Sequence, residues 1–273
     1  MAASFVSTPQ RVGGSTVPED VYGRLDAHGD RKPFRCTVRT GYHRSMAPNV
    51  LLVDNAVHRL LFRPSWHWKA HLAGVSTHTV HLPSALQPPS LTGYTHIILT
   101  GSEASILEHR PWFAAESALI HQAINRGLPV LGSCFGHEML VYTLSGPEYL
   151  RKASTPEVGW ADVQMTGEDP LFDGLPNPWR TFVFHFAEVH EPPPPWKVLG
   201  RSSRCDTHVI RYGDHPVWGI QAHPEISSRK AKIFLRGSLL LGLRPARQLV
   251  RALRNAPPPN EVAETIVRRF LNL

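Results

Sequence analysis

Short apolar runs alternate with longer segments of helix-compatible spacing through the first half of this 273-residue chain. The longer segments lie around Arg59–Ala73 and Pro111–Arg126, and Gly127 is placed to end the second one. The apolar runs are too short for helices and are typical of buried parallel strands. We expect such strands at Val50–Val53, His96–Thr100 and Leu128–Leu131, and a further strand at Thr77–Leu82. The alternation predicts an α/β fold, with a mostly parallel open sheet and helices on both faces.

The second half of the chain has a different pattern, with strand-like segments that follow one another and few helices between them. Pro192–Pro195 makes a rigid bend between two of these segments. From about Ser228 the pattern becomes helical, with an interruption at Pro257–Pro259. We therefore expect a β-rich second half that ends in a helical tail. The expected strands are Trp160–Met165, Thr181–Phe186, Trp196–Arg201, His208–Tyr212 and Val217–Gln221.

Composition divides the chain into three parts. Residues 1–49 are rich in Gly, Pro, Ser, Thr and charge, so we expect a poorly ordered extension or one draped on the core. Residues 50–228 form the expected domain, with 12 Lys/Arg against 16 Asp/Glu. Residues 229–273 carry 10 Lys/Arg against 2 Asp/Glu and form a basic tail, packed on the domain or extending it. The net charge of +7 thus belongs to the ends, and the mildly acidic body argues against a nucleic acid substrate.

Cysteine usage and hydropathy indicate a cytoplasmic protein. The three cysteines, Cys36, Cys134 and Cys205, form no C-x-x-C pair, which fits a reducing compartment. Cys36 and Cys205 are interpreted as small buried hydrophobes. No apolar run approaches the roughly 20 residues that span a bilayer. Residues 1–10 lack the basic start and apolar stretch of a secretory signal.

The sharpest local feature is Gly132-Ser-Cys-Phe-Gly136, directly after an expected strand and before an expected helix. This is the pattern of a nucleophile elbow, with cysteine as the nucleophile. Small residues flank a nucleophile in such a turn because its backbone is strained and neighbouring segments approach closely. The turn places the Cys134 thiol at a helix N-terminus, where the dipole and the free N–H groups favour thiolate. Cys134 is therefore the candidate nucleophile.

A cysteine nucleophile needs a base, and with 16 histidines abundance alone cannot identify it. His223 is the best candidate because it follows the apolar strand Val217–Gln221 and stands in His223-Pro-Glu225. In an extended chain, residues two apart point the same way. Glu225 could then hold the imidazole tautomer that Cys134 requires. The sequence therefore predicts a Cys-His-Glu triad.

Two segments resemble the class I, triad-type glutamine amidotransferases. Residues 131–140, LGSCFGHEML, resemble the family's G-x-C-x-G-H-Q-x-L segment. Residues 218–225, WGIQAHPE, resemble its closing W-G-x-Q-x-H-P-E segment. Gly159-Trp160 and residues 169–176, DPLFDGLP, resemble stand-alone, GMP-synthase-like members. The resemblance covers about residues 49–228 and implies a flavodoxin-like amidotransferase domain.

The resemblance also implies a mechanism. Cys134 would attack the γ-amide carbonyl of glutamine, and His223 would protonate the departing ammonia. Water would then cleave the γ-glutamyl thioester. The backbone N–H groups of Ser102 and Phe135 would form the oxyanion hole, with Gly101 permitting the turn. One such donor is worth about 3 kcal/mol in the transition state.

Two further residues are implied as substrate-binding candidates. The family usually has Gln where this chain has Glu138. A carboxylate there could pair with the substrate's α-ammonium group but would repel its α-carboxylate, so a γ-glutamyl conjugate remains an alternative substrate. His185 falls where relatives carry a histidine at a strand end near the substrate, and its interpretation as a structural residue is preferred.

His67 and His71 are spaced four apart on an expected helix, as two metal ligands would be. The sequence places no third ligand, and the flanking Trp66 and Trp68 favour packing instead. We therefore expect no metal and no cofactor.

Four functions are weighed on these observations. The preferred one is a glutamine amidotransferase that supplies ammonia to a separate acceptor synthetase, because the chain has no G-x-x-x-x-G-K-[ST] nucleotide loop. The second is a free-standing γ-glutamyl peptidase or hydrolase, and the third a non-catalytic regulatory relative. The fourth, a cysteine hydrolase of the dienelactone-hydrolase type, would place its acidic residue between Cys134 and His223, whereas Glu225 follows the histidine.

Overall fold

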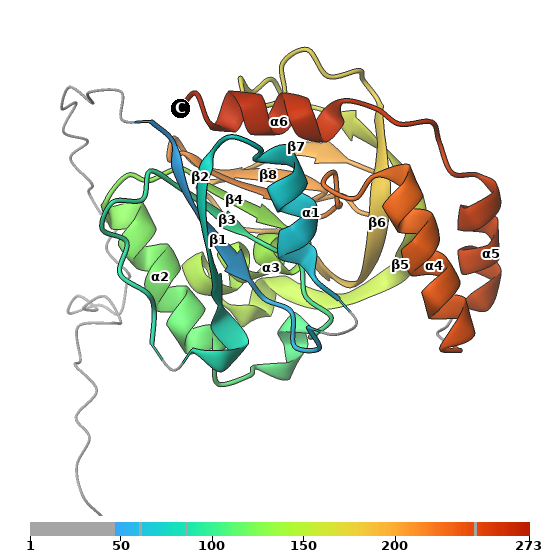
Figure 1. Ribbon diagram of the computed structural model, residues 1–273, viewed down its shortest axis with the longest axis horizontal. Helices are drawn as coiled ribbons and strands as arrows, with labels where there is room; N and C mark the ends of the chain where they lie inside the picture. Colours follow the sequence, from blue (N-terminus) through green and yellow to red (C-terminus); the bar gives the residue numbers. More distant parts are fainter. Residues whose placement is uncertain (1–46, 60–61, 86, 243–244) are drawn as a thin grey trace, which may run out of the picture. The chain divides into compact units, whose positions relative to one another are not determined.

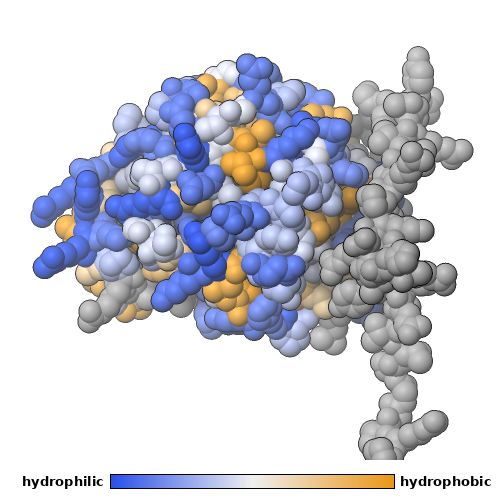
Figure 2. Space-filling view, turned by 180° about the vertical axis from the view of Figure 1, so that it is seen from behind, coloured by the Kyte–Doolittle hydropathy of each residue, from blue (hydrophilic) through white to orange (hydrophobic). Residues whose placement is uncertain are grey.

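The computed structural model describes residues 47–59, 62–85, 87–242 and 245–273 (Figure 1). The expected N-terminal extension therefore lies outside the described residues up to residue 46, and so does Cys36. Within the described ranges, no helix combines the length and the apolar character that crossing a membrane requires. On the face seen in Figure 2, hydrophilic side chains cover most of the surface, and hydrophobic ones gather in separate patches.

The described residues form one nine-stranded sheet with the order β2-β1-β3-β4-β9-β8-β7-β5-β6. Its first five strands pair in parallel. They are β2 (Ser76–His81), β1 (Asn49–Asp54), β3 (His96–Leu99), β4 (Val130–Ser133) and β9 (Val217–Ile220). This half of the sheet matches the expected parallel α/β arrangement. The carboxyl ends of β3, β4 and β9 lie side by side, which brings the segments that follow them together.

The other half of the sheet is antiparallel, in line with the expected β-rich second half. It contains β8 (Val209–Tyr212), β7 (Trp196–Arg201), β5 (Leu150–Met165) and β6 (Trp179–Val189). The expected start of β5 at Trp160 is wrong by ten residues. The early part of β5 includes exposed polar residues and a register irregularity against β6 between Lys152 and Glu157, so it has no continuous apolar signal.

Helices cover both faces of the parallel half because strand residues alternate in direction. Leu51 and Val53 of β1 pack in one cluster, and Val50 and Leu52 pack in another. The first face carries α2 (Phe113–Asn125) and α3 (Phe135–Leu144), and the second carries α1 (Pro64–His71) and α6 (Val262–Phe270). The helix expected from Arg59 begins only at Pro64, a residue suited to a first turn.

Two helices of the tail, α4 (Ser228–Leu240) and α5 (Ala246–Arg254), lie beside β5 and β6 (Figure 1). Leu235 and Leu249 from these helices bury against Phe182 of β6 in a third apolar cluster. Three short 3-10 turns complete the described elements. They span Leu82–Ser84, Ile106–Glu108 and Pro147–Tyr149.

Candidate active site

The expected strand–turn–helix is present, with Cys134 between the end of β4 and the start of α3. Its backbone has φ 50° and ψ −109°, a strained conformation for a residue with a side chain. The Cys134 N–H donates to the carbonyl of Ile220 on β9 at 2.8 Å. A Cβ on Gly136 would lie 2.5 Å from the Leu99 carbonyl oxygen, so only glycine fits there. The turn therefore holds the thiol in a fixed place at the N-terminus of a helix.

His223 follows β9 and lies against the same turn. Its N–H donates to the carbonyl of Phe182 at 2.8 Å, and its Nδ1 lies 2.9 Å from Oε1 of Glu225. The assumption of an extended backbone from His223 to Glu225 is wrong. These residues form a turn, closed by the Ile226 N–H donating to the His223 carbonyl at 3.2 Å. The turn still brings the carboxylate to Nδ1 and leaves Nε2 for the thiol.

Cys134 and His223 are both buried, and each shifts the pKa of the other. Burial raises the pKa of the Cys134 thiol, while the charge of His223 and a hydrogen bond to it lower that pKa. Burial by itself lowers the pKa of His223, but the charges of Cys134 and Glu225 and hydrogen bonds to both raise it to about 10. A charged imidazole therefore favours the thiolate, and a thiolate favours the charged imidazole, which is the mutual effect that a thiolate–imidazolium nucleophile uses.

Gly101 lies close to both members of this pair. A Cβ at Gly101 would be 2.7 Å from Cε1 of His223 and 3.5 Å from Cβ of Cys134. Ser102 follows it, with its hydroxyl donating to the carbonyl of Asn55 at 2.6 Å. Phe135 is the first residue of α3, where N–H groups have no acceptor within the helix. The structure thus brings the two candidate oxyanion segments to the nucleophile from different strands.

A buried carboxyl group supports the turn at Gly101, and sequence reasoning missed it. The Asn55 side-chain amide donates to Oε1 of Glu116 at 2.9 Å and to the carbonyl of Thr100 at 3.2 Å. Glu116 lies on α2 and is fully buried, and burial raises its pKa to about 8. No spacing rule links Asn55 to Glu116, because they are 61 residues apart.

Glu138 points into the same region from the first turn of α3. The side-chain amide of Gln221 donates to its Oε1 at 2.9 Å. Burial raises the pKa of Glu138 to about 7, against the effects of Gln221, His185 and His223, which lower it. A substantial fraction of this carboxyl is therefore neutral near neutral pH. Gln221, which the sequence analysis did not single out, fixes its orientation.

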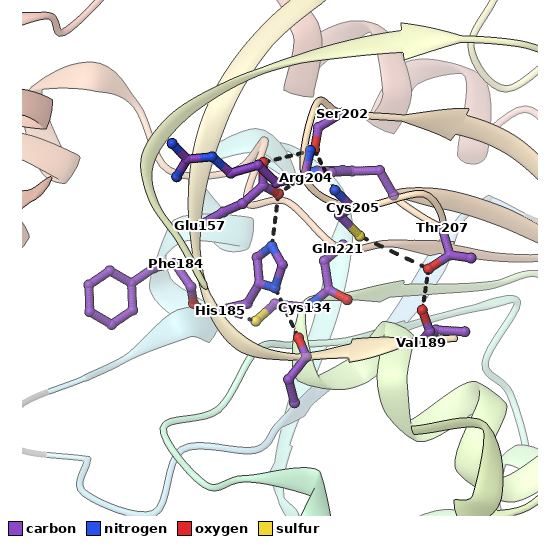
Figure 3. A network of polar contacts seen from close by, with 12 residues as sticks. Cys134, Glu157, Phe184, His185, Val189, Ser202, Arg204, Cys205, Thr207 and Gln221 are labelled. Carbon is purple, nitrogen blue, oxygen red and sulfur yellow. Dashed lines mark hydrogen bonds and ion pairs between the residues drawn. The ribbon is translucent and has the colours of Figure 1, made fainter. Parts of the chain in front are cut away.

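His185 is held by groups that the sequence did not connect to it (Figure 3). Its Nδ1 donates to the carbonyl of Ala187 at 2.9 Å, and its Nε2 lies 3.0 Å from Oε2 of Glu157. Although burial raises the pKa of Glu157, the imidazoles of His185 and His208 hold it well below its usual range. His185 and Glu157 are cross-strand neighbours on β6 and β5. The signal that could have identified them is strand register, which a single sequence does not supply.

His67 and His71 both lie on α1. His71 donates from Nε2 to the backbone carbonyl of Glu225 at 3.1 Å, so α1 contacts the turn that carries the candidate base. Burial lowers the pKa of His67 to about 4. The packing expected of the flanking tryptophans holds for Trp68, which is fully buried, and is wrong for Trp66, which is 58% exposed.

Comparisons with known proteins identify the family of this chain. The family model for glutamine amidotransferase class-I matches residues 51–238. A glutamine-hydrolysing GMP synthase subunit from Thermococcus kodakarensis is 28% identical over 188 residues, 65% of this chain and 89% of that protein. Its counterpart from Pyrococcus abyssi is 33% identical over 100 residues, 37% of this chain and 52% of that protein.

Solved structures show the same fold. A glutamine amidotransferase from Thermotoga maritima aligns with a TM-score of 0.64 at 19% identity, over 83% of this chain and 97% of that one. One from Methylobacillus flagellatus aligns with a TM-score of 0.65 at 19% identity, over 84% of this chain and 95% of that one. The family model matches well over half of the residues, and the matched range includes the elbow and the closing His-Pro-Glu segment. This chain therefore belongs to the class I glutamine amidotransferase family.

Proposed function

We propose that this chain hydrolyses the γ-amide of glutamine through Cys134, His223 and Glu225 and passes the ammonia to a separate synthetase. The observation that carries the proposal is the juxtaposition of a strained cysteine at a helix N-terminus with a buried histidine held by a carboxylate 2.9 Å away. Two segments supply the three residues: the β4–α3 turn holds Cys134, and the turn after β9 holds His223 and Glu225.

The reaction follows from these positions. The Cys134 thiolate attacks the γ-amide carbonyl carbon, and the oxyanion that forms is stabilised by the backbone N–H groups of Ser102 and Phe135. The carbon–nitrogen bond breaks as His223 transfers its proton to the leaving nitrogen, which departs as ammonia. His223 then takes a proton from water, whose oxygen attacks the thioester carbonyl. Glutamate leaves, and the cysteine is regenerated. Glu225 orients the imidazole throughout.

The relatives' activity supports glutamine as the substrate. The archaeal proteins that align over most of their length are named as subunits of a glutamine-hydrolysing GMP synthase. Longer GMP synthases align over only about a quarter of their length, for example 24% of the Thermosipho melanesiensis protein. The relatives that align over most of their length are themselves named as one subunit of the synthase, which supports a separate synthetase as the partner.

A second candidate, hydrolysis of γ-glutamyl conjugates, is favoured by one observation. Glu138 is a titratable group at a position where the family usually has an amide, and it is hydrogen-bonded in the buried site. Its ionised form would repel the α-carboxylate of free glutamine. Its neutral form would donate a hydrogen bond as an amide does. The raised pKa makes the neutral form accessible and therefore keeps glutamine as the first candidate.

The test is glutamate release by the purified chain, supplied with glutamine or with a γ-glutamyl dipeptide; the second product is ammonia from glutamine and the free amino acid from the dipeptide. We expect ammonia from glutamine, a covalent γ-glutamyl adduct on Cys134 in acid-quenched samples, and no product from Cys134→Ala. Trp66→Ala on the exposed face of α1 serves as the control and should retain full activity. Turnover of the dipeptide alone would establish the second candidate. Turnover of neither substrate, with no adduct on Cys134, would refute both.

A further inference from the structure

We propose that this chain binds one Zn²⁺ ion, or a similar divalent transition-metal ion, at a buried site near the candidate nucleophile Cys134. Glu157, His185 and Cys205 would be its ligands, with His208 supplying the fourth donor. The site is separate from the triad and independent of its chemistry. It connects β5, β6, the loop after β7 and the segment that leads into β8. Figure 3 shows Glu157, His185 and Cys205.

The donor atoms already converge. One ligand atom each from Glu157, His185 and Cys205 lies within 4.8 Å of the others. The four side chains are buried, with Glu157 4%, His185 3%, Cys205 1% and His208 0% exposed. Ligands of a tetrahedral zinc ion stand about 3.3–3.7 Å apart, as bond lengths of 2.0–2.3 Å require. Glu157 and His185 lie within β5 and β6, so the contraction that closes the site would come from side-chain rotation and from the loop that carries Cys205. His208 lies outside the three-residue cluster and would move toward it as the fourth donor.

The chemistry of the donors fits a transition metal. Imidazole nitrogen, thiolate sulfur and carboxylate oxygen together are the set that zinc takes in proteins, whereas calcium and magnesium prefer oxygen alone. The outer contacts are also those of a metal site. His185 donates from Nδ1 to the Ala187 carbonyl at 2.9 Å, which leaves the Nε2 lone pair for a metal. Ser202 donates to Oε1 of Glu157 at 2.8 Å and leaves Oε2 facing the histidines.

His208 supplies an independent observation. It is fully buried, and among the described residues neither of its ring nitrogens has a hydrogen-bond partner. Its Nε2 is directed toward the same oxygen of Glu157, at 3.4 Å. An unsatisfied buried polar group is costly, so native proteins rarely keep one without a ligand, water or ion. A metal bound by Nε2 would remove this cost for that nitrogen.

A proton is the competing explanation for part of the cluster. A doubly protonated His185 would satisfy both its contact to Ala187 and its contact to Glu157 without any metal. That explanation gives His208 only its 3.4 Å contact with Glu157 and leaves its Nδ1 without a hydrogen bond among the described residues. It leaves the Cys205 thiol with a 4.0 Å contact to Thr207 Oγ1 alone. A metal ion accounts for all four side chains, and metal binding separates the two explanations directly.

The site would act on structure and not on the reaction itself. The residue before His185 is Phe184, whose carbonyl oxygen lies 4.0 Å from Sγ of Cys134. An ion bound by Glu157, His185 and Cys205 would fix that carbonyl by tying β6 to β5 and to the β7–β8 loop. The triad does not take part in binding, so metal affinity can be measured whether or not the proposed glutaminase activity is found.

The test uses the full chain, freed of metal with a chelator and titrated with Zn²⁺ against a chromophoric competitor and, separately, with Co²⁺. We expect one equivalent of either metal and, with cobalt, a thiolate-to-metal charge-transfer band. Cys205→Ser should abolish that band and weaken zinc binding at least about 100-fold, beyond the 10–100-fold typical of losing an outer-shell partner. Cys134→Ala is the matched cysteine control and should bind both metals as the parent chain does.

His208→Gln gives a second measurement that does not alter the cysteine, and far-UV circular dichroism of each variant checks that it folds. We expect folded His208→Gln to lose at least about tenfold in zinc affinity, the lower end of the 10–100-fold range for losing an outer-shell partner. The proposal is overturned if the parent chain binds no metal, or if Cys205→Ser binds it unchanged. It is also overturned if the cobalt band depends on Cys134. If Cys205→Ser does not fold, the His208→Gln affinity decides between a metal and a proton.

Discussion

Glu138 illustrates how burial changes the meaning of a residue. In the sequence, its carboxyl group argues against free glutamine, because an ionised carboxylate would repel the substrate's α-carboxylate. In the structure, burial raises its pKa to about 7, and Gln221 donates a hydrogen bond to it. The residue can therefore act as a neutral donor on the acid side of neutrality and as a repelling charge on the alkaline side.

This titration predicts pH-dependent substrate affinity. Below its folded pKa, Glu138 is protonated and neutral, and above it the group is charged. If only the neutral form accepts glutamine, the Kd of Cys134→Ala for glutamine should rise roughly tenfold between about pH 6 and about pH 8. Isothermal titration calorimetry measures this directly, since Cys134→Ala binds without turnover. The additional change Glu138→Gln should remove the step; an unchanged step in the double variant would assign it to another group.

A second prediction at the scale of single residues concerns Gly101. A Cβ there would lie 2.7 Å from Cε1 of His223, whose ring is held on both sides by Cys134 and Glu225. Gly101→Ala should therefore displace the imidazole or the oxyanion turn. We expect kcat/KM for glutamine to fall about 10²–10³-fold, comparable to the loss of one oxyanion donor.

The control for Gly101→Ala is Gly237→Ala in α4, where an added Cβ meets nothing within 4 Å. It should leave steady-state kinetics unchanged and stabilise the helix by up to about 1 kcal/mol. Full activity in folded Gly101→Ala would show that the turn is wider in solution than the contact distance indicates.

At the scale of elements, the approach of α5 to β5 depends on two small residues. Gly159 has φ +118°, and a Cβ there would lie 2.5 Å from Cβ of Ala252. Trp160 donates from its indole nitrogen to the Ala252 carbonyl at 2.9 Å. The Gly-Trp pair that resembled stand-alone family members thus has a packing role, because it admits a helix of the basic tail close to the strand.

This contact predicts a specific sensitivity to size. Ala252→Leu should overpack the contact and lower the free energy of unfolding by about 1–3 kcal/mol. Val250→Leu on the same helix, where the side chain is 37% exposed, should change it by less than about 0.5 kcal/mol. Urea unfolding followed by circular dichroism measures both. Equal effects of the two substitutions would contradict close packing at Gly159.

At the scale of the whole molecule, α6 covers part of one face of the sheet, although it lies beyond the residues that the family model matches. Val262, Ile266, Val267 and Phe270 of α6 are buried in the cluster that contains Val50, so the first described strand and the last helix share one core. Phe270 also packs edge-on against His96 of β3, with ring centroids 5.1 Å apart. The family model ends at residue 238, before this helix begins.

Removing residues 261–273 should therefore unfold or nearly unfold the chain. The four buried side chains contribute about 6–12 kcal/mol together at about 1.5–3 kcal/mol each, comparable with the whole stability of a typical domain, about 5–15 kcal/mol. A thermal melt of the truncated chain should show no cooperative transition. Phe270→Ala provides a graded comparison and should cost about 3–5 kcal/mol. A truncated chain that melts like the parent would show that α6 is not needed for the sheet.

Patterns short enough to lie within one segment were predictable. Burial on both faces makes parallel strands continuously apolar, which revealed β1, β3, β4 and β9, and the tight turn around Cys134 requires small neighbours that are visible in any sequence. The early part of β5 was not predictable, because its side chains alternate between solvent and interior without an apolar run. The spacing of His223 and Glu225 predicted that the two residues act as a pair, but it did not predict the backbone turn that they form.

The sequence by itself determined the α/β class, the nucleophile elbow and the order of Cys134, His223 and Glu225, because each depends on neighbours a few residues away. Only the tertiary structure decided which distant groups share a buried space: Asn55 with Glu116, Glu138 with Gln221, and Glu157 with His185, His208 and Cys205. The physical reason is that strand register and burial set these contacts. Their effects on charge, seen in the raised pKa of Glu138 and of Glu116, exist only after the chain has excluded water around them.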